Sequence, residues 1–332
     1  MAYTTIDNPE LYFQVKTYSG NGSAGHAITL DGSENMQPDL VWQKRRNNTN
    51  YHVLYDSVRG ATKYVYSNTH SAENTNANGL TSFNSNGFTL GNDGDANHSS
   101  GTHVAWCWKE SATAGFDIVS YTGNGSNRTI SHSLSAVPKF IAVKNRTSAR
   151  TWINGHASIG WEKNLYFDMN SAENDSADMW NDTAPTSSVF TVGTSVGVNE
   201  NTDNIIAYLW SEKQGYSKFG SYSGNANNDG AFIYLGFKPA FFMVKNTAAS
   251  EHWRIYDNKR DTFNHMFRCL FPNEDSAEST VDNGSEEIDF LANGIKIRSS
   301  AQQLNGSGQK LIYMAFAEAP FVNSNGVPCN AR

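Results

Sequence analysis

The stretch Pro138-Lys-Phe-Ile-Ala-Val-Lys144 is one of three copies of a short apolar run that starts with proline and ends with lysine. The other copies are Pro38-Asp-Leu-Val-Trp-Gln-Lys44 and Pro239-Ala-Phe-Phe-Met-Val-Lys245. An apolar run of this length is too short for a helix, and its valine, isoleucine and phenylalanine residues favour a strand. The proline stands at the strand start, where no ladder hydrogen bond is lost. The three copies therefore predict one strand that recurs three times.

Other blocks keep the same order around these strands. A tyrosine that opens a Gly-Asn turn precedes each run, at Tyr18, Tyr121 and Tyr222, which are 103 and 101 residues apart. A Ser-Ala-Glu block follows each run, and every copy ends in an apolar strand and an acid, at residues 104–110, 206–212 and 312–318. Such self-similarity predicts a threefold internal repeat with a period of about 100 residues. The closing strand is apolar almost throughout, so we expect it to be central and buried on both faces.

The predicted elements are strands throughout the chain. No segment keeps the 3.6-residue apolar period of a helix, whereas turns and short apolar runs alternate from end to end. About seven or eight short strands per repeat are typical of a β-sandwich or jelly roll. The sequence thus predicts an all-β chain of three tandem, related β-sandwich or jelly-roll-like domains. We expect repeats at residues 13–112, 113–214 and 215–320, between an N-terminal docking arm at 1–12 and a C-terminal arm at 321–332.

The composition argues against several classes of protein. The net charge is −7 and no long Lys/Arg block occurs, so we expect no nucleic-acid binding. No apolar stretch reaches the ~18 residues of a membrane span, so we expect no membrane insertion, and the first residues lack the pattern of a signal peptide. The three cysteines, Cys107, Cys269 and Cys329, form no Cys-x-x-Cys pair, so we expect no zinc site and no cofactor. The simplest interpretation of Cys107 is a small buried apolar residue.

Acids that recur in each copy are the strongest candidates for chemistry. Glu73, Glu173 and Glu278 occupy the same place in the Ser-Ala-Glu blocks. Three tandem active sites are unusual, so we expect these acids to cap turns or to pair with bases. No Gly-x-Ser-x-Gly, His-Glu-x-x-His or Walker motif occurs, so we expect no catalytic residue and no enzyme activity. Two local ion pairs are also expected, and the middle copy lacks their equivalents: Asp56 with Arg59 and Asp257 with Arg260.

Metal binding is the less favoured interpretation of two other patterns. His52, His156 and His252 lie in comparable regions of the three copies, and a site of histidines alone would need all of them to meet. The loops at 92–97 and 31–35 offer oxygen atoms to calcium but lack a bidentate glutamate at the right place. We therefore expect solvated hairpin loops and no bound metal.

Tryptophans in polar surroundings suggest a different kind of ligand. A sugar site combines an aromatic platform with amide and carboxylate groups. Four tryptophans near Asn, Asp and Arg are the candidates for glycan binding: Trp152, Trp161, Trp180 and Trp253. We expect Trp161 and Trp180, which lie in the polar middle section, to be exposed. The alternative for all four is burial, because a β-sandwich core needs aromatic residues too.

Five longer blocks, spread over the whole chain, carry a resemblance to a known family. They are Ile6-Asp-Asn-Pro-Glu-Leu-Tyr-Phe-Gln14, Tyr55-Asp-Ser-Val-Arg-Gly-Ala61, Leu80-Thr-Ser-Phe-Asn-Ser-Asn-Gly-Phe88, Gly215-Tyr-Ser-Lys-Phe-Gly220 and Tyr313-Met-Ala-Phe-Ala-Glu-Ala-Pro-Phe321. The chain resembles virion structural proteins of marine, cyanophage-type phages, which are often labelled tail-fibre-like or lectin-like. The resemblance implies synthesis in a bacterial host cytoplasm, a place in the virion, and a homo-oligomer that contacts other tail or capsid proteins. It implies no catalytic residues.

Three functions are compatible with this resemblance. The first is a tail-associated appendage, fibre-like or attached to an adaptor, that can also bind a host-surface glycan. The second is a capsid decoration or head-fibre protein. The third and weakest is a glycan depolymerase, because no acid pair and no short β-helix repeat stands out. Attachment should involve the terminal arms, with these candidates: Ile6, Tyr12, Phe13, Phe321 and Arg332. Recognition should lie where the copies differ, at residues 45–55, 161–186 and 260–288.

Overall fold

The computed structural model describes residues 3–330, and they form an all-β fold, as the sequence predicts. The helices of this part of the chain are single turns: η1 (Pro9–Leu11), α1 (Gly94–Asn97), α2 (Ala177–Trp180), α3 (Val196–Asn199) and α4 (Gln302–Asn305). None of these described helices is long and apolar enough to cross a membrane.

The first repeat forms two antiparallel sheets. The large sheet contains, in spatial order, β1 (Phe13–Ser19), β9 (Thr102–Trp108), β3 (Leu40–Arg45), β4 (His52–Asp56), β5 (Lys63–Tyr66) and β6 (Asn74–Thr75). The small sheet contains β2 (His26–Thr29), β8 (Gly87–Leu90) and β7 (Leu80–Asn84).

The second and third repeats follow the same plan. The large sheet of the second repeat contains β10 (Phe116–Thr122), β17 (Asn204–Ser211), β12 (Pro138–Asn145), β13 (Ile153–His156), β14 (Gly160–Leu165) and β15 (Asn174–Asp175), and its strand pair is β11 (Arg128–Ser131) with β16 (Val189–Val192). The large sheet of the third repeat contains β18 (Ser217–Ser223), β24 (Lys310–Pro320), β20 (Phe237–Asn246) and β21 (Arg254–Asp257). Its small sheet contains β19 (Phe232–Tyr234), β23 (Gly294–Ile297) and β22 (Ile288–Leu291).

The closing strands β9, β17 and β24 each lie between two neighbours, so their predicted central position is confirmed. One neighbour is always the strand that the proline-to-lysine run predicts. Successive side chains of a strand point to opposite faces. On β9, Trp106 and Trp108 therefore enter one core, whereas Ala105 and Cys107 enter another. Cys107 is fully buried, as expected.

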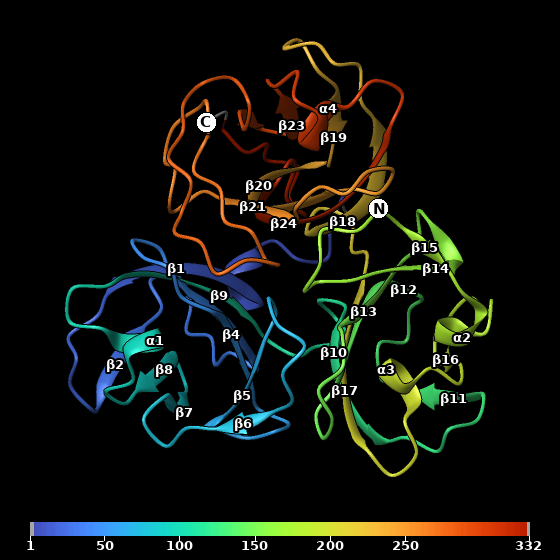
Figure 1. Cartoon of the computed structure of the whole chain (residues 1–332). Coiled ribbons are helices and arrows are strands. Elements are labelled where there is room, and N and C mark those ends of the chain that lie inside the picture. The colour runs from blue at the N-terminus through green and yellow to red at the C-terminus, as the bar shows by residue number, and fades with distance from the viewer. Residues whose placement is uncertain (1–2, 331–332) are drawn as a thin grey trace.

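Four apolar cores stabilise the fold. Three of them lie between the large sheet and the smaller strands of one repeat. The fourth is central and receives side chains from all three large sheets, which form three lobes around a common centre in Figure 1. There Trp108 of the first repeat contacts Trp210 of the second and Phe241 of the third, with ring centroids 6.1 and 5.7 Å apart. Burial of each such side chain contributes about 1.5–3 kcal/mol, so the centre strongly favours the assembled arrangement.

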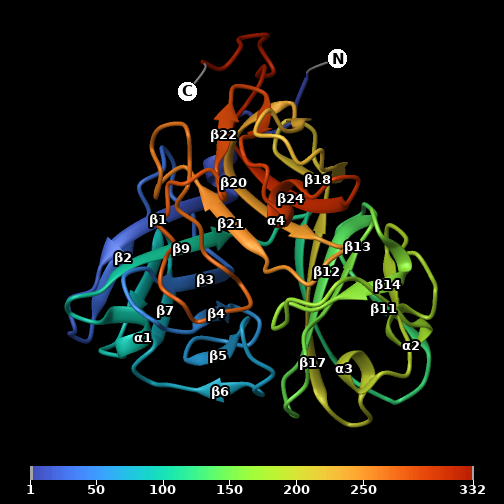
Figure 2. The ribbon, with the colours of Figure 1, turned by 45° about the horizontal axis from the view of Figure 1, so that its top comes forward.

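The three sequence repeats are thus three sheet units around one shared core. Figure 2 shows both ends of the chain on the outer side of the third repeat. The sequence predicts three separate domains, but the repeats cover one another's inner faces, so this structure does not show that each is an independent domain.

Candidate functional site

The recurring glutamates join the repeats into a closed ring. The backbone N–H groups of Glu73, Glu173 and Glu278 each donate a hydrogen bond to the next repeat, and the third repeat returns to the first. The acceptors are the carbonyl oxygens of Arg146, Thr247 and Arg46, at 2.9, 2.8 and 2.8 Å. The three Ser-Ala-Glu blocks therefore occupy the same place in the three joints, since one backbone contact is made three times around the centre.

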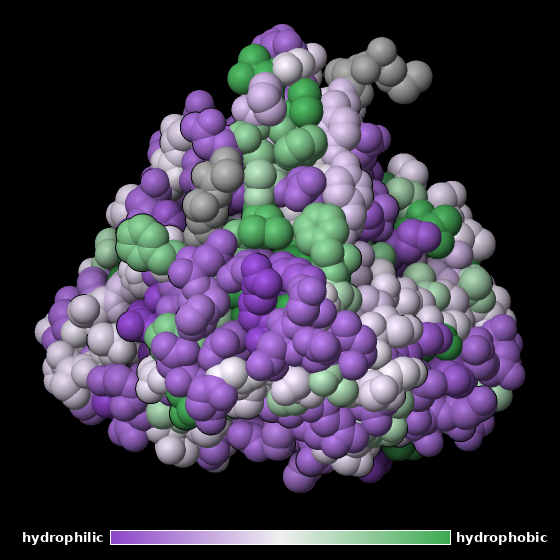
Figure 3. Space-filling model, turned by 90° about the horizontal axis from the view of Figure 1, so that it is seen from above, coloured by the Kyte–Doolittle hydropathy of each residue, from purple (hydrophilic) through white to green (hydrophobic). Residues whose placement is uncertain are grey.

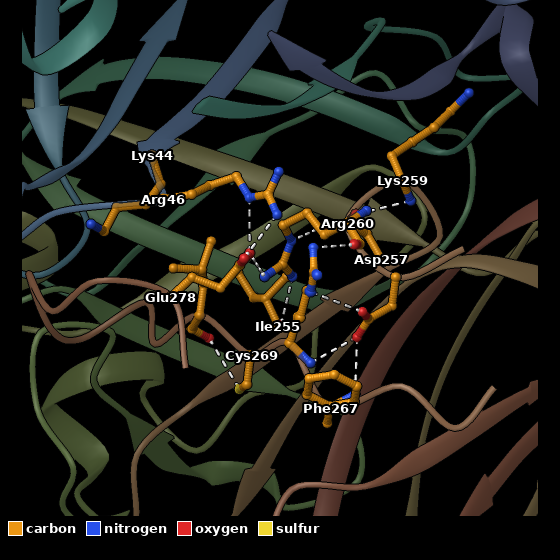
Figure 4. A network of polar contacts seen from close by, with 12 residues as sticks. Lys44, Arg46, Ile255, Asp257, Lys259, Arg260, Phe267, Cys269 and Glu278 are labelled. Carbon is orange, nitrogen blue, oxygen red and sulfur yellow. Dashed lines mark hydrogen bonds and ion pairs between the residues drawn. The ribbon is translucent and has the colours of Figure 1, made fainter. Parts of the chain in front are cut away.

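The joint between the third and first repeats buries several charges. Figure 4 shows the guanidinium groups of Arg46 and Arg260 converging on Glu278. Arg46 forms two hydrogen bonds with this carboxylate, at 3.0 and 2.8 Å, and Arg260 forms one at 3.0 Å. Arg260 also pairs with Asp257, which accepts a hydrogen bond from the Trp106 indole at 3.0 Å. Burial disfavours the charge of Arg260, but Asp257 and Glu278 outweigh it and raise the pKa of the guanidinium.

The joint between the first and second repeats has the same arrangement of buried charges. Arg59 pairs with Asp56 and Glu73, and Glu73 also forms two hydrogen bonds with Arg146, at 2.8 and 3.0 Å. The Tyr208 hydroxyl donates to Asp56 at 2.6 Å. The expected ion pairs within both repeats are confirmed, and so is the expected pairing of the recurring acids with bases.

The joint between the second and third repeats is less charged. His156 stands where the other repeats have aspartate, and its Nε2 lies 3.1 Å from the carbonyl oxygen of Tyr313. Glu173 pairs with Lys163 of its own repeat, at 2.7 Å. The middle copy thus replaces an ionic contact by a neutral one and still closes the ring.

Three buried histidines predict acid sensitivity of the fold. Burial lowers the pKa of His103 to about 3 and of His156 to about 4, and it holds the pKa of His52 well below its usual value. Below pH 6.5 the unfolded chain therefore binds protons that the folded chain excludes, so the free energy of unfolding should fall. Each of these histidines should lower the free energy of unfolding by about 2 kcal/mol at pH 5. Asp168 and Glu110 act in the opposite sense, because burial raises their pKa values to about 6 and about 7.

A single substitution separates these opposing contributions. In His156→Asn, the loss of unfolding free energy between pH 7.5 and pH 5 should be about 2 kcal/mol smaller than in the unmodified protein. Urea unfolding at both pH values measures this difference. The exposed His98→Asn variant is the control and should leave the loss unchanged. An equal loss in the unmodified protein and in His156→Asn would contradict a neutral buried His156.

The tryptophans proposed for glycan binding are all buried. Trp152, Trp161, Trp180 and Trp253 are 0%, 8%, 1% and 2% exposed, so the expected exposure of Trp161 and Trp180 is wrong. Those two rings pack edge to face in the outer core of the second repeat, because α2 folds over the large sheet. Trp152 and Trp253 enter the central core and reach the preceding repeat. Their indole nitrogens donate to the carbonyl oxygens of Tyr66 and Tyr166, at 2.7 and 2.8 Å. None of the four presents a ring face to a sugar.

The N-terminal residues proposed as a docking arm belong to the folded body, which corrects that expectation. Ile6 and Phe13 are buried in the central core, and Tyr12 packs against it. The Phe13 ring lies 4.9 Å from that of Trp108 and 5.0 Å from that of Phe316. The apolar side chains of this segment point into the central core, next to those of the first strand. The segment therefore stabilises the centre of the molecule rather than extending away from it.

The two terminal segments meet on the third repeat. The Tyr3 hydroxyl and the backbone N–H of Phe321 both donate to the carbonyl oxygen of Gly236, at 2.8 and 3.2 Å. Asp7 accepts a hydrogen bond from the backbone of Ser324 at 2.7 Å. Phe321 is half-buried by these contacts, and Arg332 lies outside the described residues.

Apolar side chains are exposed on the same repeat. Phe232 and Tyr234 of β19 are 48% and 49% exposed, and Val327 near the C-terminus is 58% exposed. Figure 3, which looks onto the third repeat, shows green atoms gathered among mostly purple ones. We call Phe232, Tyr234 and Val327 the apolar end of the molecule.

A polar groove lies between the first and third repeats. It is lined by Tyr51, Asn68 and Thr69 of the first repeat and by Asn273, Glu274 and Asp275 of the third, and its volume is about 430 Å³. We call it the Tyr51 groove. Tyr51 is 40% exposed, and its ring is held against Tyr66 with centroids 4.4 Å apart.

Backbone contacts fix the amides of the Tyr51 groove. The side-chain oxygen of Asn68 accepts from the backbone of His52, and that of Asn273 accepts from the backbone of Trp253, both at 3.0 Å. Threonine and histidine occupy the positions equivalent to Tyr51 in the other copies. Tyr51 falls within the first of the predicted variable segments, but the groove residues of the third repeat are more than 200 residues away, so the sequence alone did not bring the two sides together.

Potential metal ligands meet outside the two sequence patterns considered for metal binding. Within the described residues, the group that could hold an ion is His265, Asp282 and Glu287, in the insertion of the third repeat, and it includes none of the three histidines singled out in the sequence. The acidic loops are engaged in protein contacts: Asp93 accepts from Asn76 at 2.9 Å, and Asp31 pairs with Lys16 at 3.2 Å.

Comparison with known proteins gives one family. A family model described as a domain of unknown function (DUF7483) matches residues 8–320, a span that includes all three large sheets. A search among curated proteins finds no match.

Proposed function

The chain belongs to the DUF7483 family, and we propose that it is a structural protein of a phage virion, a tail-associated appendage that contacts a glycan on the host surface. The family description carries no role, so support comes from two other sources. One is the resemblance of five long sequence blocks to phage virion proteins. The other is the distribution of charged, apolar and aromatic groups in the fold.

The ring of repeats supports a structural role. Glu73 and Glu278 pair with arginines in two of the joints, and the aromatic residues fill a shared core. Interlocked in this way, the three repeats form a block whose parts cannot swing past one another without opening the centre. A rigid block of this kind suits a component that transmits contact between a virion and a surface.

The Tyr51 groove is the observation that carries the glycan contact. Sugar rings stack their C–H faces on aromatic side chains, while amides, hydroxyls and carboxylates bind their hydroxyl groups. The groove combines the exposed ring of Tyr51 with Asn68, Thr69 and Asp275. Because two repeats build it, it exists only in the closed ring.

The apolar end supports attachment to another virion protein. Phe232 and Tyr234 are two residues apart on the same face of β19, and neighbouring exposed apolar side chains are typical of interaction surfaces. Phe232, Tyr234 and Val327 lie on the repeat that also holds both terminal segments. The same surface would suit a capsid decoration or head-fibre protein, so the place of the protein in the particle distinguishes this second candidate from the first.

Phage particles that carry Tyr51→Ala test the proposal. We expect the protein at the tail in a virion reconstruction, and we expect the variant to assemble normally but to adsorb to host cells about tenfold more slowly. Loss of one stacking contact corresponds to about 1.4 kcal/mol of binding energy. Thr151→Ala, at the equivalent position of the second repeat, is the matched control and should adsorb normally.

Each outcome bears on a different part of the proposal. Absence of the protein from purified particles would overturn the virion role. Density on the capsid shell would overturn the tail location in favour of a capsid decoration or head-fibre protein. Normal adsorption of the Tyr51→Ala particles would overturn the glycan contact and leave the structural role in place.

A further inference from the structure

The insertion of the third repeat brings two chain segments together. Met266 and Ile288 form an antiparallel bridge, with the two backbone hydrogen bonds at 2.8 and 3.0 Å. Asn264 reinforces it, because its side chain both donates to the carbonyl oxygen of Phe290, at 2.8 Å, and accepts from its N–H, at 2.9 Å. Residues that flank a bridged pair point to the face opposite that pair. His265 and Glu287 therefore emerge on the same face of this ribbon.

A third side chain reaches the same face from the turn before β22. The Nε2 atom of His265 lies 3.0 Å from Oδ1 of Asp282. Glu287 accepts a hydrogen bond from the backbone of Gly284, which holds the turn close to the ribbon. One ligand atom from each of His265, Asp282 and Glu287 lies within 4.8 Å of the other two.

The spacing suits a single small ion. Zn²⁺ holds imidazole nitrogen and carboxylate oxygen at about 2.0–2.2 Å, so two ligand atoms on one tetrahedral ion lie about 3–4 Å apart. His265 and Asp282 have side chains that are 46% and 54% exposed, so small rotations can close the remaining distance. The bridge below them limits how far the two segments can separate.

The local charge also favours a cation. Two carboxylates, those of Asp282 and Glu287, lie beside the single imidazole of His265. Arginines near the cluster have acids of their own: Arg298 pairs with Asp289 at 2.6 Å, and Arg268 pairs with Asp261 at 3.3 Å.

We propose that His265, Asp282 and Glu287 bind one divalent transition-metal ion of the Zn²⁺ class. The ion holds the two segments of the insertion together. Imidazole with two carboxylates is a donor set for such metals, whereas Ca²⁺ and Mg²⁺ take oxygen ligands alone. Two of the three ligands, His265 and Asp282, line a cavity of about 390 Å³, and Phe263, 80% exposed, lies on its wall. A fourth coordination position therefore opens towards solvent. This site is independent of the proposed virion role.

Titration of the purified, chelator-treated full chain with ZnCl₂ tests the site. Calorimetry should show one site with a dissociation constant in the micromolar range, and Co²⁺ in its place should give the visible absorption of a tetrahedral complex. His265→Ala and Asp282→Asn should each weaken binding at least tenfold. His98→Ala removes another exposed histidine, far along the chain in the first repeat, and should bind as the unmodified protein does.

Circular dichroism of each variant verifies that it is folded, which is expected because both altered side chains are half exposed. Absence of Zn²⁺ binding in the unmodified chain would overturn the site and leave an ion pair between His265 and Asp282. Equal weakening by His98→Ala and His265→Ala would overturn it as well, because the metal would then bind elsewhere.

Discussion

The second repeat expressed alone, as residues 113–214, should remain unfolded. In the complete chain its inner face buries Phe140, Trp152, Tyr208 and Trp210 against the other two repeats. Alone, the segment would expose these side chains to water. Each of them contributes about 1.5–3 kcal/mol when buried, so the loss is of the order of 10 kcal/mol and rivals the whole stability of an ordinary domain.

The isolated segment should give a poorly dispersed amide NMR spectrum and bind a hydrophobic dye. A permuted chain is the matched control: it starts at residue 113, ends at residue 112, and joins the original ends through a short linker. Those ends lie on the same repeat, where Asp7 contacts Ser324, so the permuted chain should fold. A dispersed, dye-free spectrum of residues 113–214 would show instead that each repeat is a domain in its own right.

Asp257→Ala should destabilise the protein by about 3–5 kcal/mol, because it removes the close partner of a fully buried guanidinium. Arg260→Met should cost a similar amount by leaving the carboxylate of Asp257 buried. Combining the two substitutions should cost clearly less than the sum, with a coupling of about 2 kcal/mol or more. The reason is that the double variant leaves neither charge of the pair behind.

Urea unfolding of the two single variants and the double variant measures this coupling. Lys259→Met is the control for a neighbouring but exposed ion pair, with Asp31, and should change stability by less than about 1 kcal/mol. Strictly additive losses would mean that Arg260 is held mainly by Glu278 and by backbone contacts rather than by Asp257.

Local pattern was enough to predict the strands and their repetition. The alternation on β9 and the proline-to-lysine runs depend on residues close in sequence, so the strand positions and the burial of Cys107 followed directly. The pairing of the recurring acids with bases was also predictable, since each acid needs a partner when three copies place it alike. Which bases in the next repeat Glu73 and Glu278 contact was not predictable, because sequence spacing does not show which repeats are in contact.

The misplaced residues are covered by segments that no local sequence pattern identifies. Trp161 and Trp180 pack in the outer core of their own repeat, whereas Trp152 and Trp253 are covered by a neighbouring repeat. Ile6 and Phe13 looked like part of a terminal arm because they precede the repeat pattern, whereas the central core takes them in. The Tyr51 groove and the His265 cluster likewise need residues from separate segments, which only the folded chain brings together.

The contact between Glu278 and Arg46 has a consequence for synthesis of the chain on the ribosome. It closes the ring between the first and the third of the three repeats, which is translated after the other two. At about 5–20 residues per second, the first repeat waits roughly 10–40 s for its partner to appear. During that time the aromatic inner faces are open to chaperones and proteases. A chain that terminates early cannot cover them, so only a fully translated chain conceals the features by which the cell recognises incomplete proteins.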